Sequence, residues 1–372
     1  MTRWGATFAG ALDLRGHELA EEGFELIVCP STPAEPRFLW GAGADMLRLL
    51  AEQTIDDSQL TADSAAVIHE LEKMNLAAPT HSAEGATTTI SRPWLLSVHH
   101  ELVYALIAKV ASQLEIEVLF IKGPALHVQG LRVREHSGDV DCWVRPGDDL
   151  LLAEAMRAWG WTPMYSPLTG TGVAHSLTLN PGGWGCAIDV HTRFPGMTIE
   201  PMRAFDRVRL SAEKWTFASR EVDLPSTAVH AVIAALHDVR PIAGRPPSAV
   251  QRAGAQHALA AAGDDVVRAV EQLGATYVLR DLLQVTHPSV EIPPGEQPRD
   301  WAWRTTASGA RRYAKAWMLV PWKQKPRVLL RLVWPQPGMA GAREHPTRPG
   351  AASVAARVRR LSAALVRFIR GL

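Results

Sequence analysis

The sequence predicts an α+β fold with a small mixed sheet, preceded by an N-terminal module and followed by a helical region. Three observations support this prediction. Apolar strand-like runs alternate with helical patterns between residues 115 and 192. Two of these runs, 173–179 and 186–192, flank the turn-forming segment Asn180-Pro181-Gly182-Gly183 and predict a hairpin. From Ser226 onward, apolar residues recur at helical spacing. Few strands, interspersed helices and one hairpin are typical of a small mixed sheet.

Residues 1–78 are expected to form a small module of the winged-helix kind, because short strands alternate with short helices. The alternating run at 24–28 predicts a strand. A turn at 41–43 is expected to lead into a helix over 44–50. A second amphipathic helix is expected to begin at Asp63, since aspartate is a suitable N-cap residue.

Residues 79–92 are small, polar and non-periodic, and we interpret them as a linker. Residues 93–222 are expected to carry the sheet. The elements predicted there are a helix over 94–114, a strand over 115–121, a helix over 124–130, a strand over 140–144, a helix over 147–159 and the two hairpin strands.

The remaining chain is predicted to be helical over 223–334, with a Pro- and Gly-rich break at 286–299. A second such break is expected to open the segment 335–372, which ends in a basic amphipathic helix. The net charge of +1 hides a strong asymmetry along the chain. Residues 301–372 contain fifteen Lys and Arg and one acid, so they carry +14 and the other 300 residues carry −13.

The composition is that of a globular protein, with 47% hydrophobic and 21% charged residues, and 372 residues are enough for two or three domains. Cys29, Cys142 and Cys186 are far apart and lack C-x-x-C spacing. This excludes a disulfide scaffold and a cysteine-ligated zinc site and favours a cytoplasmic location. The first residues lack the pattern of a signal peptide, and no apolar run approaches the ~18 to 20 residues of a membrane span.

Three aspartates are the strongest chemical signal. Asp139 and Asp141 lie two residues apart on a predicted strand, so both side chains point to one face. A hard divalent cation such as Mg²⁺ relieves their repulsion, because it prefers oxygen ligands. Asp189 lies in a similar apolar strand, and three carboxylates on adjacent strands can hold two metal ions ~3.5 to 4 Å apart. A lone D-x-D is also common on surface loops, where it pairs with nearby arginines.

Other polar residues surround this pattern. Lys122-Gly123 ends the strand before a short helix, where backbone amides can approach a phosphate. A Lys-Gly-Pro segment is also often only a turn. His191 lies two residues beyond Asp189, and His175 belongs to the partner strand. Each histidine is interpreted either as a contact to an acceptor substrate or as a hydrogen-bonded structural residue.

The order of a strand ending in Lys122-Gly123, a Gly138-Asp139-Val140-Asp141 strand and a later Asp189-Val190-His191 strand resembles the DNA polymerase β-like nucleotidyltransferase superfamily. More closely, residues 94–335 resemble the bacterial uncharacterised nucleotidyltransferase family, which carries an arginine like Arg134 before its Gly-Asp-x-Asp strand. Pro124 stands where many members of the superfamily have a serine that contacts phosphate.

This resemblance implies a Mg²⁺-dependent enzyme that moves a nucleoside monophosphate from a nucleoside triphosphate (NTP), with ATP among the candidates, to a hydroxyl or phosphate acceptor. Asp139 and Asp141 would bind both Mg²⁺ ions, and Asp189 would complete the nucleophile-side site and act as a base. The residues expected to contact the phosphates are Lys122, Gly123, Arg132, Arg134, Ser137 and Gly138.

Residues 12–78 resemble the PqqD-like peptide-recognition element of enzymes that modify ribosomally synthesised peptides. The strand at 24–28, the segment Phe38-Leu39-Trp40-Gly41 and the helical run 67–76 carry this resemblance. In that family a leader peptide adds as a strand to the edge of the small sheet. The resemblance implies a precursor peptide as acceptor.

Three alternatives stay open at this point. The acceptor can be a small molecule such as an antibiotic, with the N-terminal module purely structural. A nucleic-acid-binding protein is a second alternative, although the acidic residues of 1–78 would repel DNA, so no DNA partner is expected. The basic C-terminal helix can also lie on a membrane surface or pack on the helical region.

Overall fold

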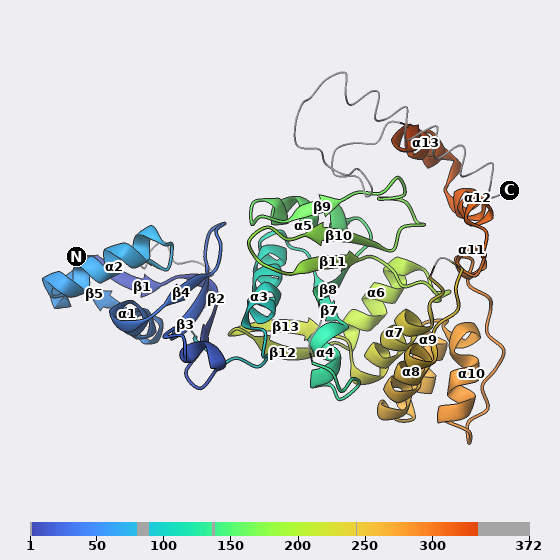
Figure 1. Ribbon diagram of the computed structural model, residues 1–372, viewed down its shortest axis with the longest axis horizontal. Coiled ribbons are helices and arrows are strands. Elements are labelled where there is room, and N and C mark those ends of the chain that lie inside the picture. Colours follow the sequence, from blue (N-terminus) through green and yellow to red (C-terminus); the bar gives the residue numbers. More distant parts are fainter. Residues whose placement is uncertain (1, 80–88, 136–137, 243, 334–372) are drawn as a thin grey trace.

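The computed structural model describes residues 2–79, 89–135, 138–242 and 244–333 (Figure 1). A mixed seven-stranded sheet forms its centre, as the alternation of strands and helices predicts. In spatial order its strands are β12 (Glu213–Phe217), β13 (Arg220–Leu224), β7 (Val118–Ile121), β8 (Asp139–Val144), β11 (Ala187–His191), β10 (Ser176–Asn180) and β9 (Thr162–Met164). Strand β8 runs antiparallel to β7 and parallel to β11, and β10 and β11 form the predicted antiparallel pair.

The two faces of the sheet pack against different helices. Val140 and Val144 point into a core that includes α3 (Val98–Gln113) and α5 (Asp148–Arg157), as the alternation along β8 predicts. Trp143, on the opposite face of β8, packs in a second core with residues of α6 (Pro201–Leu210) and α7 (Thr227–Val239). Asp139 and Asp141 share the strand face of Trp143, so the carboxylates lie on the side covered by the later helices.

The hairpin of β12 and β13 is absent from the sequence-based prediction. Its turn consists of Ala218 and Ser219, which adopt φ angles of 44° and 68°. Two positive φ values in a two-residue hairpin usually require Asn or Gly, so this turn carries no recognisable sequence signal. The short strand β9 lies at the sheet edge and also escaped prediction, because three residues are too few for a periodic pattern.

Helix α3 lies between the central sheet and the N-terminal unit (Figure 1), and this position explains why it is buried on nearly every side. Inside it, the Glu101 carboxylate accepts backbone N–H bonds from Trp94 and Leu95 and a third from Ala218. The helix is shorter than predicted, because the N–H groups of 94 and 95 bond to this carboxylate before the helix begins.

The N-terminal unit contains two three-stranded sheets and two helices. Its elements are β1 (Arg3–Ala6), β2 (Phe8–Asp13), β3 (Leu26–Pro30), β4 (Arg37–Leu39), α1 (Gly41–Glu52), β5 (Ile55–Asp56), α2 (Ala62–Lys73) and β6 (Ala77–Pro79). The sheet orders are β5-β1-β6 and β2-β3-β4. The strand predicted at 24–28 and both helices are present with shifted ends, whereas the winged-helix assignment stays a prediction.

Two local predictions in this unit are wrong. The segment 41–43 is the first turn of α1 and no separate turn precedes the helix. Thr61, and not Asp63, is the N-cap of α2, because its extended backbone lets its side chain accept the Ser64 N–H. Asp63 lies in the first turn, where its charge favours the positive end of the helix dipole.

The C-terminal region is helical, as the periodicity from Ser226 predicts. After α7 its helices are α8 (Ala249–Ala261), α9 (Asp265–Gln272), α10 (Thr276–Thr286), α11 (Trp301–Arg304), α12 (Gly309–Leu319) and α13 (Lys325–Val333). The predicted break appears between α10 and α11. The basic helix predicted after residue 350 lies outside the described residues. Across the described ranges, every helix is too short or too polar to span a bilayer.

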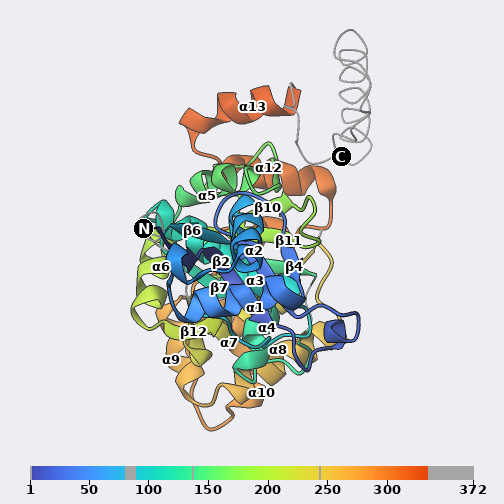
Figure 2. The same ribbon diagram turned by 90° about the vertical axis from the view of Figure 1, so that its left-hand side faces the viewer.

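Helices α12 and α13 lie beyond the main helical group and, seen from the N-terminal side, above the sheet (Figure 2). Ala316, Val320 and Val328 form a small apolar cluster with Val173 of the loop before β10. The Arg331 side chain also donates to the Thr169 carbonyl at 2.5 Å. These contacts attach the end of the described chain to the β9–β10 side of the sheet.

Candidate active site

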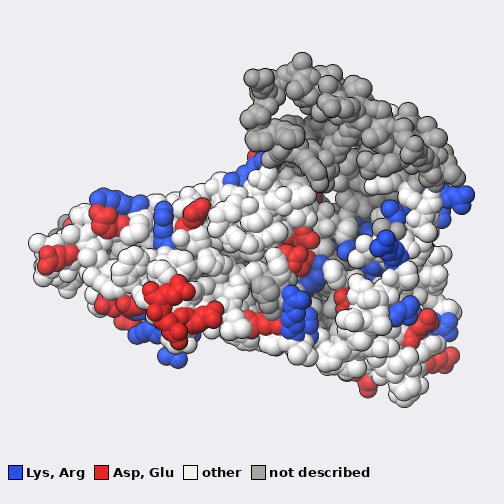
Figure 3. Space-filling view, in the orientation of Figure 1, with Lys and Arg blue, Asp and Glu red and all other residues white. Residues whose placement is uncertain are grey.

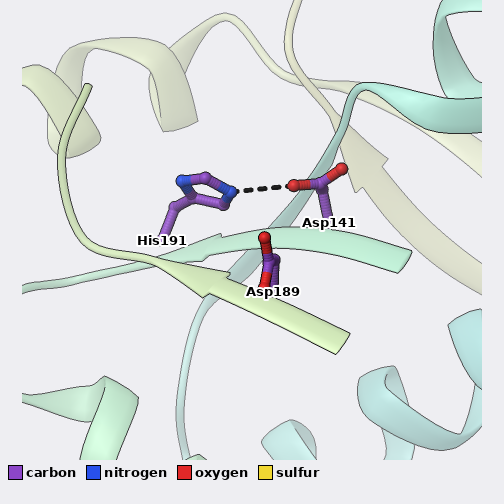
Figure 4. Close-up of side chains that lie close together, drawn as sticks. All are labelled: Asp141, Asp189 and His191. Atoms are coloured by element: carbon purple, nitrogen blue, oxygen red, sulfur yellow. Dashed lines mark hydrogen bonds and ion pairs between the residues drawn. The ribbon is translucent and has the colours of Figure 1, made fainter. Parts of the chain in front are cut away.

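The register between β8 and β11 brings two predicted aspartates together. Asp141 lies directly opposite Asp189 in this parallel pair, and His191 follows two residues later on the same face (Figure 4). One ligand atom from each of the three side chains lies within 4.8 Å of the other two. The group therefore has the geometry to hold a metal ion.

His191 is fully enclosed in this group. Its Nε2 lies 2.8 Å from Asp141 Oδ1, and its ring stacks on Phe194 with centroids 5.2 Å apart. The other ring nitrogen points away from Asp141 (Figure 4) and has no hydrogen-bond partner among the described residues. Burial, reinforced by the Lys122 charge, lowers the pKa of His191, so the ring is neutral at neutral pH. A neutral imidazole can serve as a metal ligand.

Lys122 supplies a positive charge to the same group. It follows β7, and its positive φ of 56° directs the chain into α4 (Gly123–Val128). Its Nζ donates to Asp141 Oδ1 at 2.6 Å and lies 3.1 Å from His191 Nε2. Burial alone would raise the pKa of Asp141, but the Lys122 charge and the His191 hydrogen bond hold it well below its usual range. Asp141 is therefore an anion at neutral pH.

Asp189 and Asp139 have different surroundings. Asp189 is half-buried, and its Oδ1 accepts a hydrogen bond from the Thr178 hydroxyl at 2.5 Å. Asp139 is also half-buried and begins β8 opposite Ala187. Within the described ranges, the grouped ligand atoms belong to Asp141, Asp189 and His191, so Asp139 lies on the same strand face but outside this group.

The residues predicted to contact phosphates are placed unevenly. Gly123 is buried at the start of α4, next to the Lys122–Asp141 pair, whereas Gly138 is exposed before β8. Arg132 is half-buried and donates to the Arg134 carbonyl at 2.6 Å, and the Arg134 side chain is exposed. Ser137 lies outside the described residues.

Helix α7 contributes polar residues that the sequence prediction missed. His230 accepts the Lys122 backbone N–H at its Nε2, 2.7 Å away, and so fixes the junction between β7 and α4. Burial lowers the pKa of His230 to about 3. Burial also raises the pKa of Asp238 to about 6, against the attraction of Arg132 and Lys122. The available signal was a histidine, His230, in the middle of a mainly apolar helical stretch.

His175 was expected on the partner strand but directly precedes β10, and its ring lies beside His191. The two ring centroids are 6.0 Å apart. Arg240, the C-cap of α7, approaches His175 Nε2 to 2.6 Å. Burial and the charges of Arg304 and Arg240 hold the pKa of His175 well below its usual range.

No family model matches the chain, and no curated protein sequence matches it either. Among solved structures, the chain is similar to a crystal structure of tRNA nucleotidyltransferase complexed with a primer tRNA and an incoming ATP analog. This similarity covers 72% of the chain and 94% of that chain, with 14% sequence identity and a TM-score of 0.21. Values this low carry no argument about activity, so membership of the nucleotidyltransferase and PqqD-like families stays a prediction.

The donor set itself tests whether a divalent cation fits. Two carboxylates and one neutral imidazole are a ligand combination that suits divalent metals. His191 Nε2, which faces Asp141 at 2.8 Å, is the ring nitrogen placed to join a cation there. The Lys122 ammonium already shows that this position favours positive charge, because it lies 2.6 Å from Asp141. The residues present therefore fit a divalent cation.

Proposed function

We propose that this protein transfers a nucleoside monophosphate from an NTP to a hydroxyl or phosphate acceptor, in a reaction that depends on a divalent cation. The observation that carries the proposal is the pairing of Asp141 with Asp189 across adjacent parallel strands, with His191 and Lys122 in contact with Asp141. This places two carboxylates and a lysine next to the beginning of a short helix. Phosphoryl and nucleotidyl transfer depend mainly on positioning and on neutralising charge.

Asp141, Asp189 and His191 would hold one cation, and Asp139, two residues earlier on the same face, is proposed as a ligand of a second Mg²⁺. Bound divalent cations supply charge neutralisation at the attacking and leaving oxygens. The Thr178 hydroxyl donates to one oxygen of Asp189 and so helps to hold this carboxylate in place. We propose this carboxylate as the base that accepts the proton of the acceptor hydroxyl.

Lys122 is proposed as the phosphate contact at the head of α4. Its ammonium is held 2.6 Å from Asp141, and this group would exchange that partner for a phosphate oxygen when the cation binds. Gly123 keeps the backbone beside it unobstructed, because glycine has no side chain. Arg132, with Arg134 and Gly138 near it in sequence, is proposed to contact the triphosphate from the segment before β8.

The experiment follows label from α-³²P NTPs, supplied with Mg²⁺ or Mn²⁺, into pools of hydroxyl-bearing peptides and small molecules. The wild-type chain is expected to label an acceptor and release pyrophosphate. Asp141→Asn and Asp189→Asn are each expected to reduce the rate by more than about 100-fold, because even outer-shell partners of a metal cost 10- to 100-fold. Asp148→Asn, in the first turn of α5, is the control and should keep the wild-type rate. Full labelling by either site variant would overturn the assignment.

A peptide acceptor is the narrower form of this proposal. Among the described strands, β4 pairs with β3 alone, so its other edge is a place where an extended peptide can add. Phe38 lies on β4, with its ring centroid 4.6 Å from that of Phe24, and Trp40, which follows β4, is 62% exposed. Fluorescence anisotropy of the full-length chain with labelled leader-type peptides tests it: Phe38→Ser should weaken binding, and equal binding would remove the peptide hypothesis.

A further inference from the structure

Three arginines from separate parts of the chain converge beside the candidate active site. Arg193 follows β11, Arg240 is the C-cap of α7 and Arg304 ends α11. All three raise the positive potential at His175, and Arg240 is also attracted by Asp189 and Asp141. They lie near one another although more than one hundred residues separate the first from the last.

Among the described residues, Asp300 is the acid that forms ion pairs with these arginines, and it serves two of them. Asp300 accepts from Arg193 at 2.5 Å and lies 3.7 Å from Arg304 Nε. Arg304 is only 6% exposed, yet within the part of the chain that the structure describes its Nε has no hydrogen-bond partner. Its guanidinium instead lies over the Trp303 ring, 4.4 Å from the centroid. Burial of more arginines than there are acidic partners is costly in free energy unless an anion binds to them.

The hydrogen bonding of His175 points to the same conclusion. Arg240 Nη1 lies 2.6 Å from its Nε2, and Arg304 Nη2 lies 3.5 Å from its Nδ1. A neutral imidazole accepts at one nitrogen and donates at the other, whereas guanidinium groups only donate. Arginine donors therefore face both nitrogens, and one of them meets an N–H. An oxyanion with several lone pairs would supply the acceptor that this arrangement lacks.

We propose that Arg193, Arg240 and Arg304 form a binding site for a phosphate group of a bound substrate. The proposal rests on the proposed function, which supplies two sources of phosphate, the NTP and a phosphorylated acceptor. The site adjoins the carboxylates, because His175 links Arg240 to His191 across 6.0 Å between ring centroids. Guanidinium groups suit this ligand, since their planar donors match the oxygens of phosphate.

Lys and Arg side chains gather in a hollow between the sheet and the later helices (Figure 3). The three arginines come from chain segments that follow β11, whereas Arg132 and Arg134 precede β8. A substrate can therefore meet positive charge from two separate groups of elements around the same carboxylates.

The first test uses inorganic tripolyphosphate, which has no nucleoside, with the full-length protein in EDTA. Isothermal titration calorimetry is expected to show binding by the wild-type chain. Arg240→Gln and Arg304→Gln should each weaken it by at least about tenfold, because a charged hydrogen bond contributes that much. Arg268→Gln, an exposed arginine on α9, is the control and should bind like the wild type.

The proposal would be overturned if the wild type did not bind tripolyphosphate, or if both site variants bound it as tightly as the wild type. If Arg304→Gln does not fold, as circular dichroism would show, Arg193→Gln replaces it. A transfer assay with Arg240→Gln separates the two sources of phosphate: a raised KM for the NTP assigns the site to the triphosphate, and a raised KM for the acceptor assigns it to the acceptor. Transfer without tripolyphosphate binding would refute this site alone, and binding without transfer would refute the proposed function alone.

Discussion

At the scale of single residues, the candidate site depends on how Lys122 and Asp141 compensate each other. Both are nearly inaccessible to solvent, with side chains 9% and 5% exposed, and their charged atoms are 2.6 Å apart. A buried ion pair adds little net stability, but removal of one partner leaves an uncompensated charge. Lys122 therefore allows Asp141 to stay ionised inside the fold, although the pair itself adds little to stability.

Lys122→Met should destabilise the protein by about 3 to 5 kcal/mol at pH 7, because Asp141 then lacks its cation. The effect should depend on pH. In the wild type, the lowered pKa of Asp141 gives stability that is present above the unfolded pKa and is lost as pH falls through the folded pKa. In the variant, burial without Lys122 favours the protonated acid, so the difference between the two proteins should shrink as pH falls from the variant's folded-state pKa toward the lowered pKa of the wild type.

Urea unfolding at several pH values measures this difference. The double variant Lys122→Met/Asp141→Leu is the control, since it removes both charges and should recover much of the lost stability. A constant difference from pH 7 to pH 3 would contradict the account of the pair.

The same residue scale shows what sequence reasoning can and cannot reach. Asp141 and Asp189 were predictable because a period of two along short apolar strands fixes their face. The inclusion of His191 in the ligand group depends on the parallel register of β8 and β11, which only the structure provides. Arg240 and Arg304 were out of reach, because they stand at helix ends where arginine usually faces solvent.

At the scale of elements, the close approach of β2 to α3 joins the N-terminal unit to the rest of the chain. A Cβ added at Gly10 would lie 2.8 Å from the Ala105 Cβ and 3.0 Å from the Ala218 carbonyl oxygen. Arg220 Nε also donates to the Ala9 carbonyl at 3.1 Å. The backbone of β2 therefore lies so close to α3 and to the β12–β13 turn that position 10 has no space for a side chain.

Gly10→Val should lower the free energy of unfolding by about 1 to 3 kcal/mol, as overpacking of a core does. The matched control is Gly43→Ala in α1, where an added Cβ meets nothing within 4 Å. That substitution should leave stability unchanged or raise it by up to ~1 kcal/mol, because alanine favours the helix. Differential scanning calorimetry of both variants measures the contrast, and equal melting temperatures would refute tight packing at Gly10.

Prediction at this scale succeeded where patterns were long and failed where they were short. The helices after Ser226 follow a clear period, and the structure confirms them. The β12–β13 hairpin was missed because Ala218 and Ser219 form a turn that normally carries Asn-Gly. The strands of the N-terminal unit other than β3 were also missed, since several have only two to four residues.

At the scale of the whole molecule, the site lies where the sheet meets the helical region. The sheet contributes Asp141, Asp189 and His191, while α7 contributes His230, which accepts the Lys122 N–H. The later helices bring the arginines to the same side. Of the basic segment that begins at residue 301, Arg304 reaches this site, where it lies beside His175 and pairs with Asp300.

The central claim is that Asp141, Asp189 and His191 bind a divalent cation together with an NTP. Electron paramagnetic resonance of Mn²⁺, titrated into the full-length protein with non-hydrolysable α,β-methylene NTP analogues, tests it most directly. The wild-type chain should deplete the free Mn²⁺ signal, and the Asp141→Asn/Asp189→Asn variant should bind Mn²⁺ at least about tenfold more weakly. Equal Mn²⁺ affinity of the two proteins in the presence of the analogues would contradict the account.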